Sequence, residues 1–173
     1  GPFSGFKNVS VYIHGIEDEG DSFLDSAKKA AEVGDVLIYE NRSGEISYHL
    51  VTEEKILGPE EIKSLDDLKN NKEFSKDGRI HLVYETEYKN EHRQKTSNDL
   101  TEKLIEMGLL NEETEINMFA HSYGGRRSLQ FAIDYPENVS SITTIGTPYD
   151  ENFLSSLANT FPTIAGVMNK ISD

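Results

Sequence analysis

Apolar residues fall along the chain in two kinds of pattern. Short continuous runs of apolar and β-branched residues are typical of strands buried in a parallel sheet. They predict strands at 9–13, 36–40, 80–85, 115–120 and 140–146, and alternating apolar and polar residues predict a further strand at 45–51. Elsewhere apolar residues recur at helical spacing. This spacing predicts helices from Asp21 or Ser22 to about Val33, shortly after Pro59, from one of residues 96–98 to Met107, and at 126–135. Strands that alternate with helices favour an α/β fold with a mostly parallel sheet.

Residues 36–51 depart from a plain alternation of strands and helices. The turn-forming sequence Asn41-Arg42-Ser43-Gly44 separates two strand-like runs, which predicts a β-hairpin added to the sheet. The stretch 52–78 that follows is rich in Lys, Glu, Asp and Asn, and we expect a solvated insert around its short helix. Gly34 and Gly108 follow two of the predicted helices and are expected to end them.

The most informative motif is Ala120-His121-Ser122-Tyr123-Gly124. It follows a strand-like run at 115–119 and precedes the predicted helix at 126–135, which Pro136 ends. A serine with a small residue two positions away on each side, between a strand and a helix, is typical of a nucleophile held on a sharp turn. The small residues are needed because that turn lies close to the neighbouring strand and helix. The alternative is an ordinary strand–turn–helix corner with a surface serine.

Two further motifs lie upstream and downstream of the serine. The first strand, at 9–13, ends in His14-Gly15, and the strand after the serine motif ends in Ile145-Gly146-Thr147-Pro148. In this order the three motifs resemble the lipase and esterase branch of the α/β-hydrolase superfamily. The hairpin and the polar insert resemble in particular a group of bacterial, largely uncharacterised lipase-like hydrolases. The resemblance extends over residues 9–149.

This resemblance implies a fold and a set of site residues. The implied fold is a three-layer, mostly parallel sheet with flanking helices and a hairpin insertion. It forms one domain over residues 1–173 and lacks the last strands of the family. The resemblance implies that Ser122 is the nucleophile and that the backbone N–H groups of Ile16 and Tyr123 form the oxyanion hole. Residues implied to shape the oxyanion loop and the elbow are His14, Gly15, His121 and Gly124.

A serine nucleophile needs a general base, and the base needs an acid that orients it. In the family that the chain resembles, both follow the serine, but none of the five histidines does. They are His14, His49, His81, His92 and His121. We expect His49 and His81 to be structural, because both lie in strand patterns, and His92 to be solvated in a loop. His14 is expected to brace the oxyanion loop, and His121 to point away from the substrate.

Two carboxylates near the serine are also expected to have ordinary roles. Asp134 is expected to face solvent on the helix after Ser122, and Asp150 to be a loop carboxylate or helix cap. We therefore expect the catalytic acid and histidine beyond residue 173, with the chain a C-terminally truncated fragment. In that case residues 150–173 begin a lid or cap segment. The alternative is a natural form that ends here and has lost catalysis.

Composition narrows the possible partners. The chain has 31 acidic and 17 basic residues, for a net charge of −14, which argues against nucleic acid as the main partner. It has no cysteine and no apolar run long enough to span a membrane. Gly1-Pro2 is typical of the scar left by removal of an expression tag, so any export signal would have been removed with it. The sequence leaves open a cell-surface, an extracellular or a cytoplasmic location, and also the oligomeric state.

Two functions follow from these observations. The first is a lipase- or esterase-like serine hydrolase that acts on a small-molecule or lipid ester, without a cofactor or metal. The second is a catalytically inactive binding or surface-interaction module that reuses the hydrolase fold. The intact serine motif favours the first function, and the missing histidine favours the second. The sequence does not specify the acyl chain or the alcohol.

Overall fold

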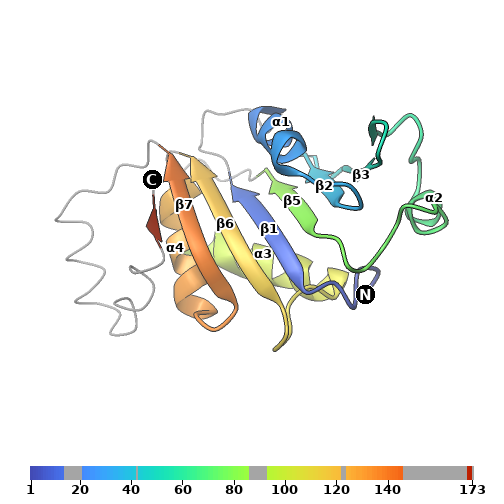
Figure 1. The fold of residues 1–173 in the computed structure, drawn as a ribbon. Helices are drawn as coiled ribbons and strands as arrows, with labels where there is room; N and C mark the ends of the chain where they lie inside the picture. The colour runs from blue at the N-terminus through green and yellow to red at the C-terminus, as the bar shows by residue number, and fades with distance from the viewer. Residues whose placement is uncertain (14–20, 42, 86–92, 122–123, 146–170, 173) are drawn as a thin grey trace, which may run out of the picture.

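The computed structural model describes residues 1–13, 21–41, 43–85, 93–121, 124–145 and 171–172, and the structural statements below concern these residues (Figure 1). The strands are β1 (Asn8–Ile13), β2 (Val36–Glu40), β3 (Ile46–Val51), β4 (Ile56–Leu57), β5 (Ile80–Tyr84), β6 (Glu115–His121), β7 (Val139–Ile145) and β8 (Ile171–Ser172). The helices are α1 (Asp21–Ala30), α2 (Leu65–Lys69), α3 (Arg93–Met107) and α4 (Gly124–Asp134).

In the described part of the chain, eight strands form one sheet in the order β4-β3-β2-β5-β1-β6-β7-β8. Neighbouring strands from β2 to β8 run parallel, whereas β3 is antiparallel to both β2 and β4. The mostly parallel sheet and the added hairpin are therefore confirmed. The strands β4 and β8 were not predicted, because two residues are too few to show a period.

The two faces of the sheet are covered by different helices. Figure 1 shows α3 and α4 behind β1, β6 and β7, and α1 in front of β2 and β5. In β1, Val9, Val11 and Ile13 pack into the core on the α3 and α4 side, and Tyr12 packs with Phe23 of α1 on the opposite side. Successive side chains of a strand point to opposite faces, so a run such as 9–13 fits a strand buried on both sides.

Helix ends differ from the prediction more than strand ends do. The helix α1 ends at Ala30 instead of Val33, whose side chain is 53% exposed. The chain turns instead at residues 31–35, where Gly34 has a φ of 93°. The helix α3 begins at Arg93, before the expected caps at 96–98. Thr96 and Ser97 are buried inside it, so these hydroxyl residues serve helix packing and not helix capping.

The residues Gly34 and Gly78 bring two turns into backbone contact beside the start of β5. A Cβ atom added to Gly78 would overlap the carbonyl oxygen of Gly34 and lie 3.0 Å from its carbonyl carbon. Backbone atoms cannot rotate away as a flexible side chain can. This contact therefore fixes the distance between the turn before β2 and the turn before β5.

We expect Gly78→Ala to lower the free energy of unfolding by about 1–3 kcal/mol, the usual cost of overpacking a tight contact. The matched control is Gly58→Ala, where the nearest atom to an added Cβ is 3.6 Å away in His49. That substitution should change stability by less than about 0.5 kcal/mol. Urea unfolding of the two variants checks this, and equal stabilities would contradict the proposed contact.

Candidate functional site

The strands β1 and β6 place the two predicted catalytic loops at one edge of the sheet. They are parallel neighbours, with Ile13 opposite Ala120, so the connections after both strands leave from the same edge. The strand β6 ends at His121 and the helix α4 begins at Gly124. Only two residues therefore connect the strand to the helix, which is the spacing that a nucleophile elbow requires.

Most of the predicted site residues lie outside the described part of the chain. These are His14, Gly15, Ile16, Ser122 and Tyr123, together with His92 and Asp150. The backbone of His121 closes β6 and that of Gly124 opens α4. The roles assigned to all these residues stay predictions. The proposed lid at 150–173 also lies outside the described residues, except for the two residues of β8.

The helix after the serine motif is fixed firmly to α3. The side chain of Arg127 in its first half is 1% exposed, and Leu129 and Phe131 pack into the core. At the other end, Asp134 Oδ2 accepts a hydrogen bond of 2.6 Å from Ser97 Oγ. Asp134 is exposed, as predicted, but it is also the residue that ties α4 to α3.

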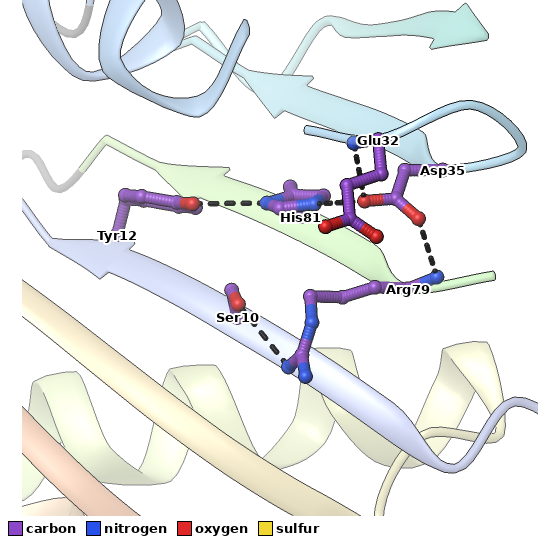
Figure 2. Close-up of polar contacts among 6 residues, drawn as sticks. All are labelled: Ser10, Tyr12, Glu32, Asp35, Arg79 and His81. Carbon is purple, nitrogen blue, oxygen red and sulfur yellow. Dashed lines mark hydrogen bonds and ion pairs between the residues drawn. The ribbon is translucent and has the colours of Figure 1, made fainter. Parts of the chain in front are cut away.

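His81 lies in a buried chain of hydrogen bonds that joins the turn before β2 to β5 and β1 (Figure 2). Its Nε2 is 2.8 Å from Asp35 Oδ2, and its Nδ1 is 2.9 Å from the hydroxyl of Tyr12. When Nε2 carries the proton and donates to Asp35, Nδ1 accepts from Tyr12. His81 is 2% exposed and both ring nitrogens are used, so it is structural, as predicted, and unavailable as a base for Ser122.

The carboxylate of Asp35 also accepts from two backbone groups. The N–H of Arg79 donates to Oδ1 at 2.9 Å, and the N–H of Glu32 donates to Oδ2 at 3.0 Å. Burial acts to raise the pKa of Asp35, but the bonds from His81, Glu32 and Arg79 outweigh it and lower this pKa. Asp35 therefore stays ionised as the anchor of this chain.

Tyr12 is held in its neutral form beside this ion. Burial raises the pKa of Tyr12 to about 12, although a hydrogen bond with Ser10 and the charge of Arg79 act against the rise. Its ring also stacks on Phe119 of β6, with centroids 5.0 Å apart and an angle of 15°. The Tyr12 hydroxyl is consequently a hydrogen-bond donor at neutral pH, not a nucleophile.

His49 is buried in β3. It is 5% exposed, and within the described chain its Nδ1 has no hydrogen-bond partner. Burial lowers the pKa of His49, and the charge of Lys28 lowers it further. His49 is therefore structural, as predicted, and favours the neutral form.

One cavity that the sequence analysis did not identify lies on the α1 side of the sheet. It has a volume of about 430 Å³ and is lined by residues of β1, β5 and β6 and of the turn after α1. Ser10, His81 and Asn117 lie in one row across these strands. The signal was present in β1, where Asn8, Ser10 and Tyr12 alternate with apolar residues, but the run was interpreted only as a buried strand.

The described residues show no sign of a metal centre or a membrane span. Among them, no three His, Cys, Asp or Glu side chains are placed to hold a metal ion. In that same part of the chain, none of the helices has the length and apolar character needed to cross a bilayer.

Comparison with known proteins agrees with this architecture. Residues 93–167, which run from α3 past β7 and include the serine motif, match the family described as alpha/beta hydrolase fold. This match covers fewer than half of the 173 residues and is a similarity to that family. No curated protein matches the sequence.

Several solved structures are similar to this chain at low sequence identity. A gene product of Listeria innocua has a TM-score of 0.49 and 16% identity, over 83% of this chain and 52% of that one. A candidate cell surface hydrolase of Lactobacillus plantarum has a TM-score of 0.46 and 14% identity, and the match covers 84% of this chain and 55% of that one. A structure from a study of carboxylesterases of the thaumarchaeon Nitrososphaera gargenis has a TM-score of 0.39 and 17% identity, and the match covers 98% of this chain and 52% of that one. The chain thus spans about half the length of these proteins.

The buried His49 should make this domain sensitive to mild acid. Its pKa is lowered in the folded state, whereas in the unfolded state it is about 6.5. The unfolded state therefore binds more protons as the pH falls below about 6.5, and stability decreases by up to about 1.4 kcal/mol per pH unit. Above that pH both states are neutral and this contribution vanishes.

Urea unfolding between about pH 7.5 and about pH 5.5 measures this effect. The loss of stability on acidification should be smaller in His49→Gln, which has no titrating group. It should also be smaller in Lys28→Gln, because removal of the lysine charge lets the pKa of His49 rise. An unchanged pH dependence in His49→Gln would rule out His49 as the cause.

Proposed function

We propose that the chain forms the nucleophile half of a serine hydrolase of carboxylic esters, with Ser122 as nucleophile. The observation that carries this proposal is the two-residue connection between β6 and α4, directly beside the end of β1. The serine motif occupies this connection, and His14-Gly15 follows β1. A strand–serine–helix corner beside a second strand end is what attack on an acyl carbon requires.

In this proposal the backbone supplies the oxyanion hole. Ser122 attacks the ester carbonyl, and the N–H groups of Ile16 and Tyr123 hold the developing oxyanion. Each such donor is typically worth about 3 kcal/mol in the transition state. The N-terminus of α4 begins two residues after the serine, and its dipole favours negative charge there.

The general base must come from outside the described residues. His49 and His81 are buried in the sheet, and the carboxyl edge of the sheet is the place where a base would have to reach Ser122. This observation also favours the second candidate function, a binding module that keeps the hydrolase fold without turnover. The two candidates differ in whether Ser122 is reactive.

A fluorophosphonate probe separates the two candidates, because it bonds covalently to an activated serine. We expect labelling at Ser122 in a longer form of the protein that also supplies the acid and the histidine, and loss of this labelling in Ser122→Ala, read by mass spectrometry of the labelled peptide. The 173-residue chain, which lacks the base, should be labelled only slowly. The matched control is Ser43→Ala, which removes an exposed serine in the turn between β2 and β3 and should leave labelling unchanged. Absence of labelling at Ser122 would favour the binding module.

Ester turnover tests the missing base. We expect the 173-residue chain to hydrolyse p-nitrophenyl acetate hardly faster than water, since loss of a triad member typically costs about 10⁴–10⁶ in rate. Fast turnover would mean that a histidine of this chain acts as base. Separate Ala variants of His14, His92 and His121 would then identify it.

A further inference from the structure

The cavity on the α1 side of the sheet is a second place where polar groups converge. Its floor is formed by β1, β5 and β6, and its wall by Ala30 and Glu32 at the end of α1. A volume of about 430 Å³ is in the lower part of the range of small-molecule sites. Of the two β6 residues that line it, Asn117 lies four residues and Phe119 two residues before His121, where β6 ends.

Three charged side chains line this cavity without neutralising one another. They are Glu32, Asp77 and Arg79, and within the part of the chain that the structure describes none of them forms an ion pair. The guanidinium of Arg79 makes one weak contact, 3.4 Å to Ser10 Oγ. Figure 2 shows the side chains of Glu32 and Arg79 on the same side of β1 and β5.

The other ionisable groups of the cavity are already satisfied. Asp35 accepts from the ring of His81 and from two backbone N–H groups, and His81 also bonds to Tyr12. A ligand therefore meets one cation, Arg79, and two exposed carboxylates, Glu32 and Asp77. A simple anion would be repelled by the two carboxylates, and a simple cation by the guanidinium.

An aromatic surface lies beside these charges. The ring of Phe119, half-buried, lines the cavity and is fixed in orientation by its stack on Tyr12. The amide of Asn117 accepts from Ser141 Oγ at 2.7 Å through its Oδ1, which leaves its –NH₂ group as a donor. An apolar ring of a ligand can pack on Phe119 while its polar end meets Arg79 and Asn117.

We propose that this cavity is a binding site for a zwitterionic α-amino acid with an aromatic side chain. The ligand carboxylate pairs with Arg79, a planar fork suited to carboxylates. The ligand ammonium pairs with Glu32 and Asp77, and the ligand ring packs on Phe119. This site is separate from the proposed ester hydrolysis and does not depend on Ser122.

Titration with L-phenylalanine, followed by backbone amide chemical shifts, tests the proposal. Binding of L-phenylalanine in the millimolar range should change the backbone amide chemical shifts around Ser10, Arg79 and Asn117. Phenylalaninamide lacks the carboxylate and N-acetylphenylalanine lacks the ammonium, so each should bind at least tenfold more weakly. Equal binding of all three compounds, or no shifts at these residues, would overturn the proposal.

Variants assign each half of the zwitterion to its partner. Arg79→Gln should weaken L-phenylalanine at least tenfold and leave the weak binding of phenylalaninamide unchanged. Asp77→Asn should weaken L-phenylalanine and leave N-acetylphenylalanine unchanged or tighter. Arg79→Gln should fold, because the bond that holds Asp35 comes from the backbone N–H of residue 79.

Two controls complete the test. Glu54→Gln removes an exposed carboxylate that does not line the cavity, and it should bind L-phenylalanine as the unmodified chain does. Ser122→Ala should also bind normally, which keeps this test independent of the proposed hydrolase activity. Normal binding by Arg79→Gln would overturn the proposed site.

Discussion

The carboxylate of Asp35 is the interaction on which the α1 side of this domain depends. Through backbone N–H groups it joins the turn before β2 to Arg79, the residue before β5, and it also fixes the ring of His81. His81 in turn fixes the hydroxyl of Tyr12 in β1, and the Tyr12 ring stacks on Phe119 of β6. The turn before β2 and the three strands β5, β1 and β6 are thus connected in sequence, starting from one buried ion.

Such a chain is stable only when it is complete. A buried carboxylate without its donors would cost several kcal/mol, because it has lost its water. The carboxylate of Asp35 accepts hydrogen bonds from His81, Glu32 and Arg79, which keep it ionised and lower its pKa despite burial. The close approach of Gly78 to the backbone of Gly34 brings these donors within reach. A small residue in a turn is therefore a condition for the polar network in the sheet.

Strands and helices, which depend on neighbouring residues, could be predicted from the sequence. Contacts between residues far apart in the chain could not. Six of the eight described strands were predicted within one residue, since each shows a local apolar pattern, a run in five of them and an alternation in β3. The ends of α1 and α3 were wrong because Val33 is apolar but exposed, and because Thr96 and Ser97 pack between helices. The polar network was missed because Asp35 and Tyr12 are 46 and 69 residues from His81.

The candidate site divides in the same way. The serine motif is contiguous, so its place between β6 and α4 could be predicted, and the structure gives the ends of both elements accordingly. No local pattern could indicate that Glu32, Asp77 and Arg79 surround one cavity. Their meeting depends on the sheet order, in which β5 lies between β2 and β1 although it follows both in the sequence.

Alternation along β1 explains how one strand can serve both the core and two separate sites. Val9 and Val11 face the helices α3 and α4, Ser10 and Tyr12 face the cavity, and the residue after Ile13 begins the proposed oxyanion loop. On the cavity side of the sheet, hydrogen bonds hold the polar side chains in place. Polar residues at the rim of the cavity can therefore be substituted without disturbing the apolar core on the other side. Arg79 is such a member, because its structural contact with Asp35 is made by the backbone. The proposed binding in the cavity and the proposed chemistry at the carboxyl edge therefore rest on different residues of the same sheet.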